Sequence, residues 1–421
     1  MTRVAMIVWN EFRNDARVLK EAQTLQGAGY QVCVFALHTP GVTKQRERLD
    51  DGIEIHRVAR SPLWKWRKRG ASTPTPAAPA SAPAPAPAQG PIGPISLKHQ
   101  VLRIVARAWT HLNLLFSMVR YRADVVHAHD VNTLPTAWLA AKLSGAKIIY
   151  DAHEISTSRE GYNSFRKLVG LVEKRLMPRV NGSITTTDAR AKYFARAYGV
   201  ERPTVLQNRP RLTMSPASER IRQELGLSQP WPIILYQGGL QQGRGLEKLV
   251  RTAAQVPQAY FVFIGGGRLA HNLIELSRQL GLEDRVHFIP TVALAELPAY
   301  TASADIGVQP IENTCLNHFT TDSNKLFEYL IAGLPVVATD FPEIRRIVRG
   351  NDVGCLVPAN NPEALAEALN RLVAEPLLRE HYAGNARITA QRLNWEEQEN
   401  QLTGLYQRVL GARAQGSRVQ P

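Results

Sequence analysis

The segment 236–247, Tyr-Gln-Gly-Gly-Leu-Gln-Gln-Gly-Arg-Gly-Leu-Glu, combines four glycines with one arginine. It follows an apolar run and leads into an amphipathic stretch, which predicts a loop between a strand and a helix. Glycines such as Gly238 and Gly239 let the backbone approach a ligand, and Arg244 stands at the helix start, where exposed N–H groups and a cation both favour phosphate. The segment therefore predicts a phosphate site. The alternative is a plain glycine-rich turn with an exposed arginine.

The segment 323–337, Ser-Asn-Lys-Leu-Phe-Glu-Tyr-Leu-Ile-Ala-Gly-Leu-Pro-Val-Val, is the most specific stretch of the chain. We expect Ser323 to cap a short helix that Gly333 ends before an apolar strand. Lys325 then lies in the first turn, where a cation suits phosphate, and Glu328 lies one turn further. The alternative for Glu328 is an exposed helix carboxylate without a ligand.

Histidines follow two expected strands in the first half of the chain. Residues 124–130 contain His127 and His129, and residues 150–154 contain His153. The carboxyl edge of a parallel sheet is where open α/β folds bind ligands, and a neutral imidazole there can hydrogen-bond a ligand hydroxyl. A structural histidine is the alternative for His153. It is the favoured interpretation for His127 and His129, because no third ligand completes a His-x-His metal pair.

The pattern of apolar residues predicts an α/β protein with two parallel sheets. Apolar runs of four to seven residues alternate with amphipathic stretches of ten or more, which is typical of βαβ units. Strands are expected near residues 3–9, 31–37, 53–58, 124–128, 146–150, 182–186, 203–207, 232–237, 260–264, 285–289, 304–308, 335–338 and 353–356. Helices are expected at 15–28 and 133–144, and the pattern after Asn361 is helical only.

The same pattern predicts two Rossmann-like domains. The first spans 1–207, a Pro-rich linker spans 208–230, and the second domain spans 231–393. The last segment, 394–421, is expected to form a helix to about 411 that crosses back to the first domain, followed by a short tail. An Ala/Pro-rich insertion at about 70–96 lacks side chains for a core and is expected to be disordered.

Positive charge is concentrated in one region. The net charge is +15, and residues 60–122 contain ten Lys or Arg and no Asp or Glu. Within this region, 63–69 places two tryptophans among basic residues, which suits an anionic membrane interface, and 97–120 is an apolar helix candidate with a polar stripe. The alternatives are a solvated basic surface and a helix that packs in the core. Nucleic-acid binding is not expected, because the region lacks a recognised motif.

Composition and cysteine usage indicate the class of protein. The 421 residues are 44% apolar and 21% charged, as in soluble proteins with two ordinary domains. Cys33, Cys315 and Cys355 are far apart, so neither a disulfide framework nor a zinc site is expected. The apolar run 3–9 is too short for a signal peptide or a membrane span. We therefore expect a cytoplasmic protein, peripheral at the inner face of the cytoplasmic membrane where the basic patch meets lipid.

The glycine-rich segment resembles the donor-diphosphate segment of the retaining glycosyltransferases of family 4, the glycosyltransferase group 1 type. In that family a Gly-Arg pair stands at the strand end and a Lys-Gly pair follows. Here Gly238-Gly239 and Arg244-Gly245 stand in those places, so one of the two usual cations is absent. Lys325, near a helix start, is expected to replace it.

Other segments resemble the same family. Segment 323–337 is similar to the second half of its Glu-x7-Glu element, which gives Glu328 the ribose hydroxyls, although Thr320 stands where the first Glu is expected. Segment 150–154 is similar to its active-site histidine segment, which places His153 against the transferred sugar. The resemblance implies donor contacts at Gly238, Gly239, Gly265, Gly266, Ile289, Ser323, Asn324, Leu326 and Glu328, and catalytic roles for His153, Arg244, Lys325 and Asp15.

Residues 12–21 look like the family's Asp-x-Arg-Val segment. The resemblance lets Asp15 meet an acceptor hydroxyl and Arg17 an acceptor phosphate. The alternative is that Asn14 or Asp15 only caps the first helix.

The resemblance spans nearly the whole chain apart from residues 60–97, and it implies a GT-B fold with two Rossmann-like domains facing an interdomain cleft. The implied reaction moves a sugar from a UDP- or GDP-sugar to a hydroxyl of a glycan or lipid-linked acceptor, with retention and without a metal ion or cofactor, in cell-surface polysaccharide or glycolipid synthesis. One alternative is a GT-B sugar-nucleotide epimerase. Another is a non-catalytic subunit that binds nucleotide sugar or a membrane partner, which Gly239 and Thr320 keep open.

Overall fold

The structure is a computed structural model that describes residues 1–13, 15–60, 97–159, 165–213 and 216–416. Contacts divide the chain into two compact units, residues 1–150 and 151–421, and each is described by itself. The division falls earlier than the linker expected at 208–230, and the domain bounds drawn from the sequence stay a prediction. The Ala/Pro-rich insertion at about 70–96 and the tryptophan-containing segment 63–69 lie outside the described residues.

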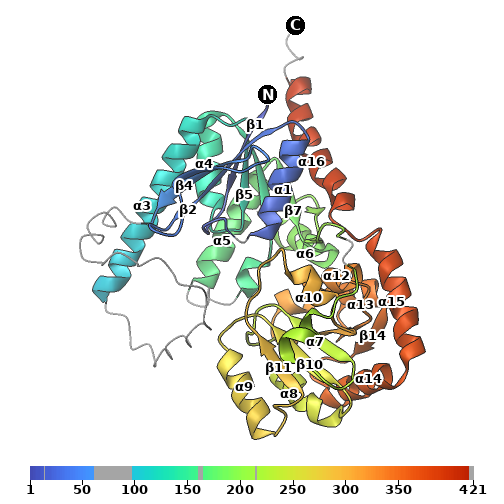
Figure 1. Cartoon of the computed structure of the whole chain (residues 1–421). Coiled ribbons are helices and arrows are strands. Elements are labelled where there is room, and N and C mark those ends of the chain that lie inside the picture. Colours follow the sequence, from blue (N-terminus) through green and yellow to red (C-terminus); the bar gives the residue numbers. More distant parts are fainter. Residues whose placement is uncertain (14, 61–96, 160–164, 214–215, 417–421) are drawn as a thin grey trace. The chain divides into compact units, whose positions relative to one another are not determined.

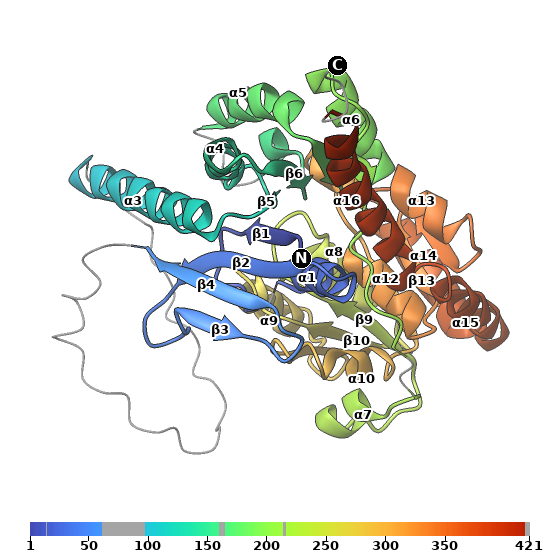
Figure 2. The ribbon, with the colours of Figure 1, turned by 90° about the horizontal axis from the view of Figure 1, so that it is seen from above.

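The first unit is a sheet with helices packed on it (Figure 1). Its elements are β1 (Arg3–Ile7), α1 (Ala16–Gly27), β2 (Gln31–His38), β3 (Arg46–Arg48), β4 (Glu54–Ala59), α3 (Leu97–Tyr121), β5 (Val125–His129) and α4 (Leu134–Ser144). The strands lie in the order β3-β4-β2-β1-β5, and Figure 2 shows β3, β4, β2 and β1 side by side. β1 pairs in parallel with β2 and β5, β2 pairs in parallel with β4, and β3 is antiparallel to β4. The chain enters the second unit within β6 (Lys147–Ala152).

The second unit contains a six-stranded parallel sheet in the order β11-β10-β9-β12-β13-β14. Before this sheet come η2 (Ser156–Ser158), α5 (Arg166–Leu176), η3 (Met177–Arg179), β7 (Gly182–Thr185), α6 (Asp188–Tyr198), β8 (Thr204–Val205) and α7 (Arg220–Leu225). The sheet and its connections are β9 (Ile233–Gln237), α8 (Leu246–Thr252), η4 (Ala253–Gln255), β10 (Tyr260–Ile264), α9 (Ala270–Gln279), β11 (Val286–Ile289), α10 (Leu297–Thr301), β12 (Ile306–Gln309), α11 (Leu316–Phe319), α12 (Asn324–Ile331), β13 (Val336–Thr339), α13 (Pro342–Val348) and β14 (Gly354–Val357). Three helices follow, α14 (Pro362–Ala374), α15 (Pro376–Ala390) and α16 (Glu396–Gly416).

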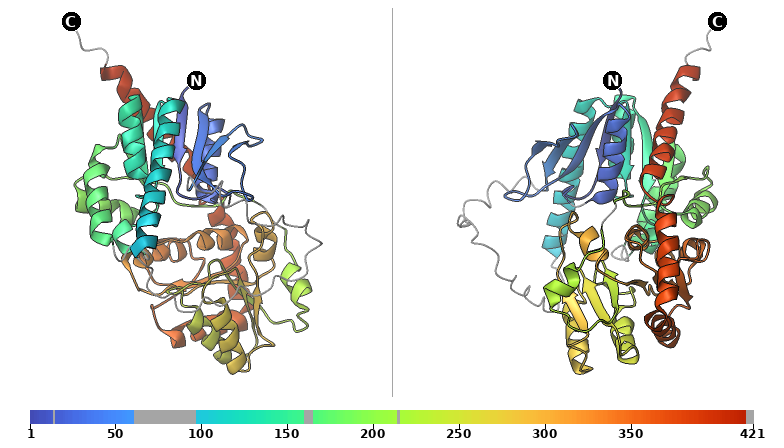
Figure 3. Two further views of the ribbon diagram at one scale, coloured as in Figure 1. Left: turned by 90° about the vertical axis from the view of Figure 1, so that its left-hand side faces the viewer. Right: turned by 45° about the vertical axis from the view of Figure 1, so that its right-hand side comes forward.

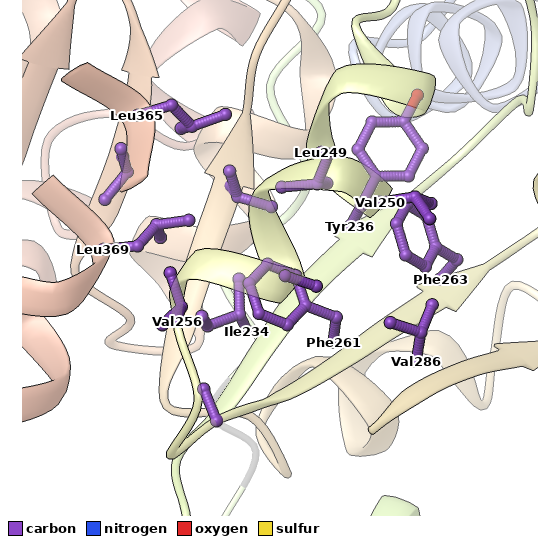
Figure 4. Packing of buried hydrophobic residues seen from close by; sticks show 14 of the residues in the cluster. Ile234, Tyr236, Leu249, Val250, Val256, Phe261, Phe263, Val286, Leu365 and Leu369 are labelled. Atoms are coloured by element: carbon purple, nitrogen blue, oxygen red, sulfur yellow. The ribbon is translucent and has the colours of Figure 1, made fainter. Parts of the chain in front are cut away.

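Each face of the six-stranded sheet carries its own apolar core. Successive residues of a strand point to opposite faces, and β9 illustrates this: Ile234 and Tyr236 belong to one core, and Ile233 and Leu235 belong to the other. Side chains of α8, α9 and α14 cover the first core, part of which Figure 4 shows. Side chains of α7, α12 and α13 cover the second. Strands buried on both faces read as continuous apolar runs, which is why the sequence located them.

The prediction of two parallel α/β sheets is confirmed, and each expected strand range overlaps an observed strand. The expected helices at 15–28 and 133–144 are α1 and α4, and from Asn361 to residue 416 the described chain forms helices and no strand. β3 was not expected, because its sequence Arg-Glu-Arg has no apolar alternation and it lies at the sheet edge. Among the described residues, no helix has both the length and the apolar character needed to span a bilayer.

The last helix, α16, contacts the segment around β7 and β8. Gln398 Oε1 accepts a hydrogen bond from the Gln207 backbone N–H at 2.8 Å, and Arg408 Nη2 donates to Thr204 Oγ1 at 3.4 Å. A Cβ atom built on Gly182 would lie 3.0 Å from side-chain atoms of Leu405, so the helix packs closely on β7.

Two neighbouring residues of α9 test the first core of the second unit. Leu273 is fully buried in it, whereas Ile274 is 47% exposed. We expect Leu273→Ala to lower the free energy of unfolding by about 2–5 kcal/mol, because it leaves a cavity in a packed core. Ile274→Ala is expected to change it by about 0.5 kcal/mol or less. Urea unfolding followed by circular dichroism measures both, and equal losses would contradict the assignment of this core.

Candidate functional site

Two glycine turns meet at the carboxyl ends of β9 and β10. The Gly238 N–H donates to Ile264 O at 2.8 Å, and the Leu240 N–H donates to Gly266 O at 3.0 Å. A Cβ atom on Gly265 would lie 2.2 Å from Gly238 O, which no side chain tolerates. The close approach of the two backbones therefore explains in part why glycines stand at positions 265–267, directly after β10.

The loop before α8 is pressed against a second backbone segment. Gly245 has φ +72°, and a Cβ atom there would lie 1.9 Å from Pro310 O. Gly243 has φ +75°, and a Cβ atom there would lie 2.5 Å from the His318 ring. Arg244 lies between these two constrained glycines, so its half-buried side chain leaves the backbone from a fixed position.

Lys325, in the first turn of α12, has a buried side chain. Its Nζ lies 5.0 Å from the centroid of the Tyr236 ring and 3.2 Å from the position of a Cβ atom on Gly238. Burial, the main cause, and the nearby charge of Arg244 together lower the pKa of this lysine to about 7, and Glu328 partly opposes the shift. A buried ammonium beside an arginine favours an anionic ligand at this place.

Glu328 lies one turn along α12 at the carboxyl end of β9. Its Oε2 accepts a hydrogen bond from Gln237 Nε2 at 2.5 Å, and Gln237 Oε1 accepts one from Thr301 Oγ1 at 2.9 Å. The half-buried carboxylate is thus held by a short polar chain rather than by apolar packing. The structure places Lys325 and Glu328 one turn apart on α12, as the sequence predicted, and both lie near the carboxyl end of β9.

The other donor residues expected from the resemblance differ in exposure. Ser323 has φ +59° and makes no side-chain cap bond, and Asn324 is exposed. Leu326 is buried in the core with its N–H bonded to Ser323 O at 3.2 Å. The Ile289 carbonyl accepts from the Gly265 N–H at 3.0 Å. The side chain of Leu326 therefore has a packing role, and the donor contacts of these residues stay predictions.

His153 follows β6 and is oriented by a carboxylate. Its Nε2 lies 3.0 Å from Oδ2 of Asp151, which is fully buried. Its carbonyl oxygen accepts a hydrogen bond from Arg190 Nη1 at 2.7 Å. The ring is partly exposed and held by side-chain and backbone contacts, as a histidine that must present one face to a ligand requires.

Arg190, on α6, is a residue of this site that the sequence analysis missed. It is buried, its Nε donates to Thr320 Oγ1 at 3.2 Å, and its Nη2 donates to Asn317 O at 3.0 Å. It thereby joins the His153 backbone to Thr320, which stands where the resemblance led us to expect a glutamate. The sequence around Arg190 reads as an ordinary amphipathic helix, so no local signal marked it.

A cavity of about 250 Å³ lies beside these residues in the second unit. It is lined by Glu154, Ser158, Arg159, Arg190, Gln241, Gln242, Arg244, Cys315, Asn317, His318 and Thr321. The lining has three arginines and one glutamate, and Glu154 pairs with Arg159 at 3.4 Å. The remaining positive charge favours a polar, anionic ligand.

Asp15, the fourth expected catalytic residue, belongs to the first unit and caps α1. Its Oδ1 accepts from the Val18 N–H at 3.2 Å, and its Oδ2 accepts from Asn10 Nδ2 at 2.7 Å. The capping alternative is therefore what the structure shows, and a catalytic role for Asp15 stays a prediction. Arg17 is buried and pairs with Glu21 at 3.0 Å, so the expectation that it binds an acceptor phosphate is not supported.

The same first unit brings His127 and His129 together with Glu21. The two rings stack with centroids 4.3 Å apart, and His127 Nε2 lies 3.8 Å from Glu21 Oε2. Candidate ligand atoms of the three residues lie within 4.8 Å of one another, so Glu21 is the third side chain that the sequence did not reveal. Arg17 already supplies a positive charge to Glu21. The expectation that the protein works without a metal ion stays a prediction.

The glycine pair after β9 tests the site. Gly238 has φ +126° and contacts Lys325, whereas a Cβ atom on Gly239 would make only an ordinary contact with Gln241, at 3.5 Å. We expect Gly238→Ala to weaken binding of UDP or GDP about tenfold, because strain of about 1–2 kcal/mol moves the loop against the ammonium. Gly384→Ala, at a glycine of α15 outside the site where a Cβ atom would meet nothing within 4 Å, is the matched control and is expected to bind within about twofold of the unaltered chain. Isothermal titration measures both, and similar losses in the two variants would argue against a site at Gly238.

Comparison with known proteins agrees with this geometry. A family model described as glycosyl transferases group 1 matches residues 217–389, and a glycosyl transferase 4-like domain matches residues 15–209. Together they cover most of the chain. The chain is 24% identical over 305 residues to D-inositol 3-phosphate glycosyltransferase of Xylanimonas cellulosilytica, covering 67% of this chain and 71% of the relative. It is 26% identical over 336 residues to phosphatidyl-myo-inositol mannosyltransferase of Mycobacterium leprae, covering 78% and 84%.

Solved structures show the same fold. Sucrose-phosphate synthase from Thermosynechococcus elongatus superposes with a TM-score of 0.77 at 19% identity, covering 98% of this chain and all of that one. HepE of Anabaena, in complex with UDP, superposes with a TM-score of 0.71 at 17% identity, covering 96% and 99%. With two parallel-sheet α/β units and both family models matched, the chain belongs to the group 1 glycosyltransferases with the GT-B fold.

Proposed function

We propose that this glycosyltransferase takes a sugar from a UDP- or GDP-sugar bound by its second unit and transfers it, with retention, to a hydroxyl of a glycan or lipid-linked acceptor. The observation that carries the proposal is the buried ammonium of Lys325, next to Gly238 and within the electrostatic reach of Arg244. Two cations gathered at glycine turns suit a diphosphate, which carries negative charge and many acceptor oxygens. A neutral ligand would not balance the positive charge of Lys325 and Arg244.

The proposed chemistry is electrostatic. When the bond from the sugar to the diphosphate breaks, negative charge develops on the leaving group, and Arg244 and Lys325 are fixed in place to stabilise it. Because these cations are already present, we expect no requirement for a divalent metal ion. Glu328 is assigned the ribose hydroxyls, and His153, oriented through Asp151, a hydroxyl of the transferred sugar.

Relatives support the donor and acceptor classes. HepE binds UDP and, in another structure, UDP-glucose. The mycobacterial relative is named for a phosphatidyl-myo-inositol acceptor and the transfer of mannose. We therefore infer a hexose as the transferred sugar, and cell-surface polysaccharide or glycolipid synthesis as the pathway. A lipid-linked acceptor would bring the enzyme to the inner face of the cytoplasmic membrane.

The non-catalytic alternative rested on Gly239 and Thr320, where two charged residues of the family pattern are missing. Lys325 lies beside Gly238, so a cation from α12 stands next to the position where the family's arginine is missing. Arg190 contacts Thr320 but, as a cation, does not replace the missing carboxylate. The position of Lys325 supports an active transferase. The epimerase alternative would require nucleotide release from the donor in the absence of an acceptor.

The proposal is tested by a panel of nucleotide sugars, read first as a rise in melting temperature and then as turnover with the donor that binds. We expect Arg244→Ala to lower kcat about 10² or more, because it removes one preorganised charge. Glu328→Gln should mainly weaken donor binding, and Glu367→Gln, an exposed carboxylate of α14, is the matched control with unchanged binding and turnover. Turnover should persist in EDTA. Loss of activity in EDTA, or unaltered kinetics of Arg244→Ala, would contradict the proposed chemistry.

A further inference from the structure

The helix α3 exposes an unusual amount of apolar surface. Large apolar side chains that are 44% to 69% exposed occur along its outer side, at Val101, Leu102, Ile104, Val105, Trp109, Leu112 and Phe116. Single exposed apolar residues are common on soluble proteins, but a contiguous group on one helix marks an interaction surface. We name this group the outer face of α3.

The outer face lies opposite the side by which α3 packs on its own unit. Thr110, Leu114 and Met118 are buried and repeat every four residues, so they form the packed side. Val105 and Leu112 lie on the opposite side by helical geometry, with seven residues, or two turns, between them. The helix is therefore apolar on both sides. A helix that is apolar on both sides is expected to be buried on both sides, so we expect its outer side also to be covered and shielded from water.

The charges around the outer face indicate what covers it. Residues 97–122 of the described chain contain arginines and no Asp or Glu, and α4, which packs beside α3 (Figure 3), has a lysine and no acid. Arg120, one turn after Phe116, is exposed on α3 itself. A second copy of the chain would bring like charges together, whereas an anionic lipid surface attracts them.

We propose that the outer face of α3 inserts into the headgroup layer of an anionic phospholipid membrane. The apolar side chains enter the boundary between headgroups and acyl chains, Arg120 contacts lipid phosphates, and Trp109 lies at the level that indole rings prefer. The inference needs neither the identity of the donor nor turnover. Where the proposed function also holds, it places the first unit at the surface that carries a lipid-linked acceptor.

The test is co-sedimentation of the full chain with vesicles of phosphatidylcholine, with and without phosphatidylglycerol, at low and high salt. The variant carries Ile104→Ser, Leu112→Ser and Phe116→Ser, all on the outer face. The matched control carries Ile274→Ser, Leu377→Ser and Ile388→Ser, which are 47%, 79% and 65% exposed in the second unit. Melting temperature and UDP binding, measured on all three proteins, separate loss of membrane binding from misfolding and from failure of the donor site.

We expect the unaltered chain and the control to bind the anionic vesicles, and the outer-face variant to bind about tenfold or more weakly. Salt should weaken binding without abolishing it in the unaltered chain, because the apolar contribution is not screened. Absence of binding by the unaltered chain, or equal binding by the variant, would overturn the proposal. So would a dimer in analytical ultracentrifugation that the outer-face variant abolishes, because the face would then be covered by a second copy.

A second measurement does not depend on the triple variant. Lipids brominated near the headgroup quench tryptophan fluorescence at short range, and Trp109→Phe removes the one tryptophan of the outer face. We expect the quenched fraction to fall in Trp109→Phe. An unchanged quenched fraction would place the contact elsewhere on the chain and overturn the assignment to α3.

Discussion

The burial of the Lys325 ammonium is the constraint from which the donor side of this enzyme follows. A lysine rarely gives up its hydration, and here it does so beside a second cation, Arg244, which lowers its pKa further to about 7. A Cβ atom at Gly238 would lie only 3.2 Å from the ammonium, so the glycine gives it room, and Tyr236 offers it the face of an aromatic ring. Under the proposed function, this arrangement is unfavourable in the free protein and becomes favourable when a diphosphate binds.

The elements around Lys325 hold this arrangement in place. β9 and β10 are neighbours in one parallel sheet, so their carboxyl ends present both glycine turns to the same point. Gly265 and Gly245 allow backbone approaches that a methyl group would block, and these approaches fix the loop that carries Arg244. Two apolar cores on the faces of the sheet keep the strand ends rigid. The position of the Lys325 ammonium is thus set by the glycine turns and by the packing of the two apolar cores, which lie at some distance from it.

Sequence patterns located most of the fold because the strands are buried on both faces and read as apolar runs. β3 was not predicted, because a short charged edge strand contains no apolar run. Arg244 and Lys325 were predicted as phosphate-binding residues from helix starts and glycine spacing, both of which are local, and the role of Glu328 was assigned from the resemblance of its segment to the family. Arg190 and Glu21 were not, since each meets its partners through contacts far apart in sequence. The helix α3 was read as a possible core helix, because periodicity reports an apolar face without telling whether anything covers it.

The central claim is that the buried Lys325 side chain has a lowered pKa and binds an anionic ligand. The pKa can be measured directly by NMR titration of the isotopically labelled lysine side chain, with the signal assigned by comparison with Lys325→Met. In the free protein the account predicts a midpoint near pH 7. Saturation with UDP should raise the midpoint by about one pH unit or more, because the diphosphate favours the charged form. Donor affinity should then fall as the pH rises through 7. A midpoint near the ordinary lysine value of 10.5 in the free protein, or a midpoint that UDP leaves unchanged, would contradict the account.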